Sequence, residues 1–132
     1  MFIKPTYKII DQIGVHEKYI RRNHFNTIKV WWARRPITTM RFLLIKETLL
    51  KSNNENDLIE SELISTLNPS LEILNDFISK YKTKQLSVLD VFSGGGSIPL
   101  ESARLGFKTL SYELNPIAYL AQETVFNSLK IY

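Results

Sequence analysis

Three consecutive glycines separate an apolar run from a helix-like segment in "SVLDVFSGGGSIPLESARLGFKTLSYELNP", which spans residues 87–116. The run before them, residues 86–92, is apolar and partly β-branched, which is typical of a buried parallel strand. Glycine at a strand–helix junction lets the backbone turn sharply and approach a ligand, because no Cβ atom stands in the way. The predicted ligand-binding loop consists of Ser93, Gly94, Gly95 and Gly96.

Two acidic residues lie where the ligands of parallel sheets are usually held, at the carboxyl ends of the strands. Asp90 is near the end of the first predicted strand, and Glu113 directly follows a second one over residues 107–112. The carboxylate of Glu113 could accept both hydrogen bonds of a ribose diol. Asp90 could reach a cationic group or a bridging water. The pattern therefore predicts a ligand that contains a nucleoside.

Three nucleotide ligands compete for a loop of this kind. A phosphate-binding P-loop ends in Gly-Lys-Ser/Thr, and "GGGSIP" contains no lysine. The dinucleotide site of nicotinamide or flavin enzymes requires G-x-G-x-x-G, where Gly94 and Gly96 fit but Pro99 replaces the third glycine. S-adenosylmethionine has no pyrophosphate, and its ribose diol and zwitterionic methionine end suit acids on both sides of the loop. We therefore favour S-adenosylmethionine, with a dinucleotide as an alternative.

Helices are expected before and after these strands along the chain. Apolar residues at helical spacing predict a helix over residues 37–51. An Asn-Pro pair predicts another over residues 116–129, with Asn115 as its cap, and a second pair predicts a helix over 69–81, with Asn68 as its N-cap. The order strand, helix, strand, helix with short connections is typical of a right-handed parallel crossover.

Glycine and proline mark the expected ends of other elements. Gly106 is expected to end the helix of residues 98–105 at its C′ position. Pro5 and Gly14 are interpreted as breaks, so residues 1–15 are expected to be extended. The remaining predicted helices cover residues 15–22 and 57–67.

The chain has 132 residues and a net charge of +4 that is unevenly distributed. Residues 1–51 hold eleven Lys and Arg against three Asp and Glu, whereas residues 52–132 hold six against ten. The basic part could attract a polyanion such as DNA, or could be a solvated basic surface. The absence of cysteine excludes disulfides and Cys-based zinc sites. Without a signal peptide or a bilayer-spanning apolar run, we expect a cytoplasmic protein with no membrane partner.

Two blocks resemble one known family. "LDVFSGGGSIPLESARLGFKTLSYELNPIA" closely resembles the first cofactor motif of S-adenosylmethionine-dependent DNA amino-methyltransferases, Asp-x-Phe-x-Gly-x-Gly followed by an acidic strand end and Asn-Pro. "HFNTIKVWWARRPITTMRFLLI" is similar to the Trp-Trp-Ala-Arg-Arg-Pro block that opens a family of large adenine-specific DNA methylases. Both blocks occur in that family's order, with one departure at Lys29, where a histidine is expected.

The resemblance implies a site for S-adenosylmethionine and DNA as a partner. It implies that the first cofactor motif consists of Asp90, Phe92, Ser93, Gly94, Gly95 and Gly96. It also implies that Glu113 binds the ribose hydroxyls, and that the methionine end of the cofactor lies near Arg34, Arg35 and Pro36.

The motif that performs amine methylation in these enzymes is missing from this sequence. The motif reads Asn/Asp-Pro-Pro-aromatic; its oxygens accept hydrogen bonds from the target amine, and its ring stacks on the flipped base. The two Asn-Pro pairs, Asn68-Pro69 and Asn115-Pro116, continue with Ser and Ile instead. We therefore predict no catalytic residue and no turnover by this chain alone.

The resemblance implies a sheet with more strands than the two that this sequence supports. We expect an α/β, incomplete Rossmann-like methyltransferase fold, with two parallel strands and flanking helices after a mostly helical basic N-terminal region. The predicted domains are residues 1–57, which hold the Trp-Trp-Ala-Arg-Arg-Pro block, and residues 58–132, the first half of the cofactor-binding domain. A truncated or split enzyme is expected, with a complementary chain as a possible source of the remaining strands. The alternative function is a DNA- or protein-binding module without cofactor.

Overall fold

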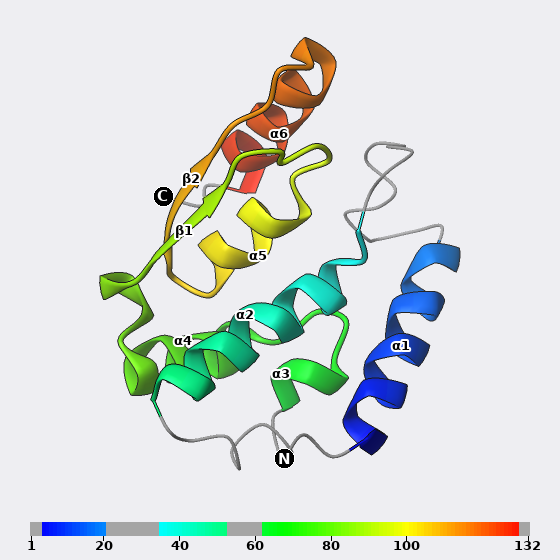
Figure 1. Cartoon of the computed structure of the whole chain (residues 1–132), viewed down its shortest axis with the longest axis vertical. Coiled ribbons are helices and arrows are strands. Elements are labelled where there is room, and N and C mark those ends of the chain that lie inside the picture. The colour runs from blue at the N-terminus through cyan, green and yellow to red at the C-terminus, as the bar shows by residue number, and fades with distance from the viewer. Residues whose placement is uncertain (1–3, 21–34, 53–61, 130–132) are drawn as a thin grey trace.

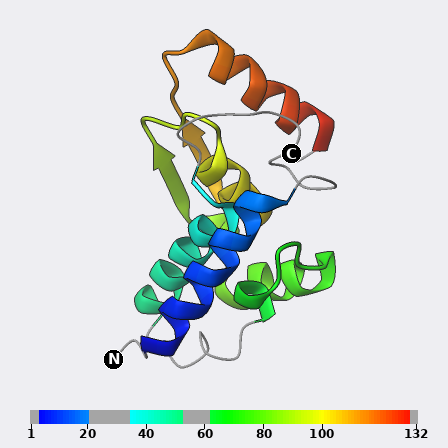
Figure 2. The ribbon, with the colours of Figure 1, turned by 90° about the vertical axis from the view of Figure 1, so that its right-hand side faces the viewer.

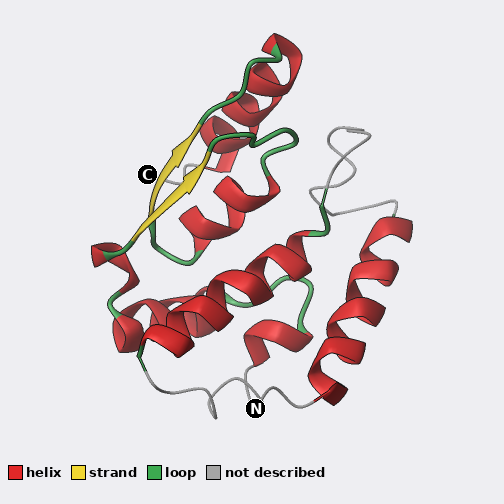
Figure 3. Cartoon of the chain, viewed as in Figure 1, coloured by secondary structure: helices red, strands yellow, loops and turns green. Residues whose placement is uncertain are grey.

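The computed structural model describes residues 4–20, 35–52 and 62–129. In chain order the elements are α1 (Lys4–Tyr19), α2 (Ile37–Lys51), α3 (Glu62–Ser65), α4 (Leu71–Tyr81), the 3-10 helix η3 (Thr83–Gln85), β1 (Ser87–Asp90), α5 (Ser97–Arg104), β2 (Lys108–Ser111) and α6 (Pro116–Leu129). They form a mixed α/β structure in which a small sheet lies at one side of the helices (Figure 1, Figure 3). The expected α/β class is confirmed at this level.

The sheet consists of β1 and β2, which pair in parallel with Ser87 opposite Lys108 and Asp90 opposite Ser111. Helix α5 connects the two strands and packs against both of them and against α2. This is the strand–helix–strand unit that the sequence predicts. It places the carboxyl ends of β1 and β2 side by side, next to the start of α5.

The helix ends follow local sequence signals at most positions. Asn115 caps α6 through its side-chain oxygen, as predicted. Gly106 follows α5 with a φ of +81°, a left-handed conformation that confirms its predicted role. At α4 the prediction of Asn68 as N-cap is wrong, because the hydroxyl of Ser70 accepts the N–H of Ile73 at 3.3 Å. The helix begins one residue beyond that serine, which is itself a favoured N-cap residue type.

The N-terminal segment is helical, and the expectation of an extended chain there is wrong. Pro5 is the second residue of α1, where a missing backbone N–H breaks no helical hydrogen bond. Gly14 lies where α1 packs on α2, and a Cβ atom at this position would be 3.0 Å from Oγ1 of Thr39. The glycine therefore permits close approach of two helices and does not mark a break.

One hydrophobic core joins α1 to α5. Its buried members are Ile10, Phe42, Ile45, Leu49, Leu63, Ile64, Leu74, Phe77 and Leu105. A second, smaller cluster connects α2, α5 and α6 and contains Ile37, Leu100 and Val125. Residues on both sides of position 57 thus share a core. Within the described ranges, no helix is both long and apolar enough to cross a membrane.

One face of the sheet is bare in the described structure. Helices α5 and α6 lie on one side of the two strands, and no described element covers the other side (Figure 2). Leu89 and Leu110 are register partners on this face, and they are 62% and 61% exposed. Val91 and Tyr112 extend the apolar surface. The prediction that β1 is a buried strand is therefore wrong for the described residues, since its composition suits a sheet covered on both faces.

This bare face leads to a first prediction. Replacing Leu89 by Lys and Leu110 by Glu together is expected to reduce self-association, because an exposed apolar face favours contact between copies. The free energy of unfolding should change by less than about 0.5 kcal/mol, as for other surface substitutions. Light scattering and urea denaturation measure the two effects. The control is Val88→Lys on the helix-covered face, which should lower the free energy of unfolding. If the double variant lost as much unfolding free energy as Val88→Lys, the result would contradict a bare face at Leu89 and Leu110.

Candidate functional site

The glycine loop forms a tight turn between β1 and α5. Gly94 and Gly96 have φ values of +48° and +81°, which glycine adopts without the steric penalty of a Cβ atom. The N–H of Gly96 donates to the carbonyl of Ser93 at 2.8 Å, and the carbonyl of Gly96 accepts the N–H of Leu100 at 3.0 Å. Gly96 thus ends the turn and is the N-cap of α5. The backbone at Gly95, between them, carries no side chain that could block a ligand.

Ser93 anchors this loop to the end of β2. Its backbone N–H and its hydroxyl both donate to the carbonyl of Tyr112, at 3.1 and 3.0 Å. The side chain is buried. Since Tyr112 directly precedes Glu113, the loop and the predicted ribose-binding acid are held next to each other.

Glu113 contacts the glycine loop directly. Its Oε2 atom accepts the N–H of Gly94 at 2.6 Å, and its Oε1 atom accepts the N–H of Asn115 at 2.8 Å. The side chain is half-buried. Each carboxylate oxygen has lone pairs for a second hydrogen bond, so the pair of oxygens can still accept a ligand diol.

Asp90 and Phe92 form the first part of the loop. The Oδ1 atom of Asp90 accepts the N–H of Phe92 at 3.2 Å, which turns the chain away from the strand. Asp90 is half-buried, whereas the ring of Phe92 is 85% exposed. The structure brings both residues to the same end of the sheet as the glycines and Glu113, and Phe92 offers apolar surface there.

The segment before α2 reaches the same region from elsewhere in the chain. The hydroxyl of Ser97, at the start of α5, donates to the carbonyl of Arg35 at 2.8 Å. Pro36 follows, and α2 begins at Ile37, whose N–H donates to Oε1 of Glu17 at 2.7 Å. Glu17 is fully buried, and it satisfies N–H groups at the start of α2 that have no partner within the helix. Arg35 and Pro36 are therefore fixed beside the glycine loop.

Some predicted residues lie outside the described residues. These are Arg34, which the resemblance places near the methionine end of the cofactor, and Lys29, where the sequence departs from the family block. Across residues 4–20, 35–52 and 62–129, no group of three His, Asp or Glu side chains is placed to hold a metal ion.

A buried ion pair fixes α5, and with it the glycine loop, against α2. The Nε atom of Arg41 lies 3.1 Å from Oε2 of Glu101, and both side chains are at most 1% exposed. The guanidinium of Arg104 lies 2.6 Å from the other carboxylate oxygen. Burial raises the pKa of Glu101 and lowers the pKa of Arg41 from their ordinary values, although each charge favours the other. Because burial disfavours the charged carboxylate, Glu101 depends on Arg41 and Arg104 to remain ionised.

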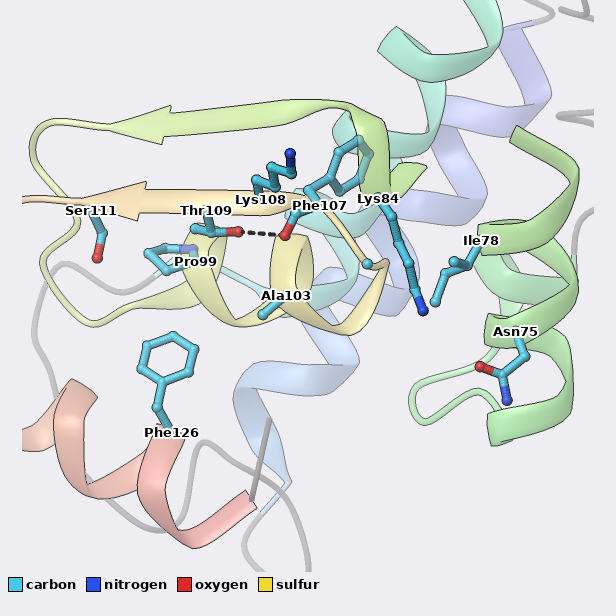
Figure 4. A pocket seen from close by; sticks show the side chains of 11 residues that line it. Asn75, Ile78, Lys84, Pro99, Ala103, Phe107, Lys108, Thr109, Ser111 and Phe126 are labelled. Atoms are coloured by element: carbon cyan, nitrogen blue, oxygen red, sulfur yellow. Dashed lines mark hydrogen bonds between the residues drawn. The ribbon is translucent and has the colours of Figure 1, made fainter. Parts of the chain in front are cut away.

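Two cavities lie near these elements and differ in their lining. The smaller has a volume of about 190 Å³ and lies against Ser93, Glu113 and Gln122. Complete ligand sites usually exceed about 300 Å³, so this cavity fits one part of a ligand. The larger, of about 770 Å³, lies between α4, α5, β2 and α6 (Figure 4). Lys84 lines it, but none of the predicted site residues does, so we place the candidate site at the smaller cavity.

Buried polar residues on helices were not identified from the sequence. The clearest is Gln122, whose Nε2 atom donates to the carbonyl of Gly94 at 2.8 Å. It is 6% exposed and lies on the same face of α6 as the buried Ala118 and Val125. A polar residue at helical spacing within an apolar stripe is the signal that could have found it. Glu17 on α1 shows the same pattern.

Comparison with known proteins gives a family match for the N-terminal part of the chain. Residues 5–66 are similar to a family described as "Protein of unknown function (DUF1156)". The matched range covers just under half of the chain, includes the Trp-Trp-Ala-Arg-Arg-Pro block and ends before the glycine loop. No solved structure matches the chain.

Proposed function

We propose that this chain forms the S-adenosylmethionine-binding part of an adenine-N6 DNA methyltransferase, built on an incomplete Rossmann-like sheet. The observation that carries the proposal is the 2.6 Å hydrogen bond from the Gly94 N–H to Glu113. It joins a glycine loop at the end of one parallel strand to a carboxylate at the end of the next. This arrangement supports recognition of a ribose diol beside exposed backbone, at the edge where parallel sheets bind ligands.

The start of α5 favours S-adenosylmethionine over a dinucleotide. Pyrophosphate binds at a helix N-terminus, through free N–H groups and close backbone approach. Here the Ser97 hydroxyl donates to the Arg35 carbonyl, so residues 35 and 36 lie against that helix end. Pro99 is fully buried at the position where a dinucleotide fold has its third glycine. The N-terminus of α5 therefore suits a cofactor without pyrophosphate, such as S-adenosylmethionine, better than a dinucleotide.

The proposed roles follow from what each side chain offers. S-adenosylmethionine supplies the methyl group that is transferred. Glu113 accepts hydrogen bonds from the ribose hydroxyls, and the backbone at Gly94 and Gly95 lets the cofactor approach. Arg35, beside the loop, is suited to pair with the methionine carboxylate. Because the Asn/Asp-Pro-Pro-aromatic motif is absent, the groups that hold the adenine amine must come from another polypeptide segment.

The bare sheet face supports the same proposal. Leucines such as Leu89 and Leu110 are typical of strands that are covered on both faces of the sheet. Here more than half of each of these side chains is exposed. In a complementary chain or a longer one, further strands would extend the sheet at its edges, and further helices would cover this face and carry the missing motif with them. DNA is the proposed second partner, consistent with the basic composition of residues 1–51.

Calorimetric titration with S-adenosylmethionine tests the proposal. We expect wild-type protein to bind, and Glu113→Gln to bind at least about tenfold more weakly, since hydrogen bonds to a charged group contribute about 1.5–3 kcal/mol. Asp76→Asn, which removes one exposed carboxylate from α4, is the matched control and should bind as wild type does.

Titration of the same proteins with S-adenosylmethionine, DNA and NAD separates the proposed function from its alternatives. Failure of the folded wild-type chain to bind S-adenosylmethionine would contradict the proposal. Salt-sensitive binding to DNA by that same protein would then favour the module without cofactor. Binding of NAD that is weaker in Glu113→Gln would instead favour a dinucleotide as the ligand of this site.

A further inference from the structure

Both backbone polar groups of Gly94 are held by side chains from other elements. Its N–H donates to Oε2 of Glu113 at 2.6 Å, and its carbonyl accepts a hydrogen bond from Nε2 of Gln122 at 2.8 Å. The same nitrogen of Gln122 donates to the hydroxyl oxygen of Ser93 at 3.0 Å. The two N–H bonds of this amide are therefore directed at two successive residues of the glycine loop.

Gln122 also packs against the far end of the loop. A Cβ atom at Gly96 would lie 2.8 Å from Cγ of Gln122, so a glycine is needed where the side chain passes. Gln122 is nearly fully buried, and buried amides are stable only when their donors are satisfied. The loop and this one side chain thus determine each other's position.

We propose that Gln122 is a positioning residue, which holds the glycine loop from α6 in the conformation that receives the cofactor. The inference rests on the proposed function. Its physical basis is preorganisation: a loop that is already ordered does not lose conformational freedom when the ligand binds. Gln122 acts through Gly94 and Ser93, because its donors are directed at them and not at the ligand. Helix α6 is thereby coupled to the candidate site, whose cavity lies beside it.

The test uses Gln122→Met, which keeps the length of the side chain and removes both donors. We expect its affinity for S-adenosylmethionine to fall about tenfold, which corresponds to about 1.4 kcal/mol. The amide resonances of Gly94 and Gly96 should shift, and their hydrogen exchange should accelerate. Thr124→Ala is the control, because it removes another side-chain hydrogen bond of α6, to the Leu120 carbonyl, on an exposed position. All titrations are made well below each protein's unfolding temperature.

The outcomes distinguish this inference from the proposed function. If wild type binds and Gln122→Met binds equally well, the proposed function stands and the positioning role is overturned. If Gln122→Met only unfolds more easily, with unchanged amide resonances and affinity, Gln122 is structural and the inference is again overturned. If wild type does not bind, the proposed function fails, and unchanged exchange at Gly94 and Gly96 would overturn the loop-holding role separately.

Discussion

Replacing Arg41 by methionine is expected to lower the free energy of unfolding by about 3–5 kcal/mol, the range for breaking a buried ion pair from one side. The guanidinium of Arg41 donates to the carbonyls of Leu63, Thr66 and Leu67 at 2.8–3.0 Å. It also neutralises Glu101, which is fully buried. Methionine fills a similar volume but leaves these acceptors without a donor and the carboxylate with one cation fewer.

Urea denaturation of the two proteins measures this loss. Glu47→Gln, an exposed change on the same helix, is the control and should stay within about 0.5 kcal/mol of wild type. The double variant Arg41→Met with Glu101→Leu should be more stable than Arg41→Met alone, because it no longer buries a carboxylate that has lost a partner. A loss below about 1 kcal/mol in Arg41→Met would show that the pair contributes no more than a surface ion pair.

The sequence predicts those parts of the molecule whose signals are local. The glycine loop, Asn115 at the start of α6 and Gly106 at the end of α5 each depend on a few neighbouring residues, and the structure places them as expected. The proximity of Glu113 to the loop also follows, since adjacent parallel strands end at the same edge of a sheet. These features bring the predicted residues together without any knowledge of the remaining fold.

The parts that sequence analysis misses depend on contacts between distant segments. Gly14 is interpreted as a break because its helix packing against Thr39 is invisible in the sequence. Glu17 caps a helix that begins twenty residues later, and Gln122 bonds a loop that precedes it by twenty-eight. Spacing can indicate that such polar residues lie on a buried face, but it does not name their partners. Those partners determine whether the residue supports a site or only the fold.

A comparison of two glycines provides the second prediction with a large effect. Gly96 and Gly106 both have a φ of +81°, so alanine at either position should cost about 1–2 kcal/mol from the left-handed backbone alone. A Cβ atom at Gly96 would be 2.8 Å from Cγ of Gln122, and one at Gly106 would be 3.0 Å from Cγ1 of Ile78. Both variants should therefore lose about 2–4 kcal/mol of unfolding free energy once these contacts are added.

Only one of the two substitutions should also disturb ligand binding. Alanine at Gly96 displaces Gln122, whose amide holds Gly94, whereas alanine at Gly106 acts at the opposite end of α5, away from the loop. In protein that is folded at the temperature of titration, Gly96→Ala should lose at least about tenfold in affinity for S-adenosylmethionine, equivalent to about 1.4 kcal/mol, and Gly106→Ala should bind as wild type does. Urea denaturation and calorimetry on the same preparations give both quantities. Equal affinities of the two variants for S-adenosylmethionine would mean that the turn at Gly96 contributes to stability alone. That result would contradict the assignment of the glycine loop as the cofactor site.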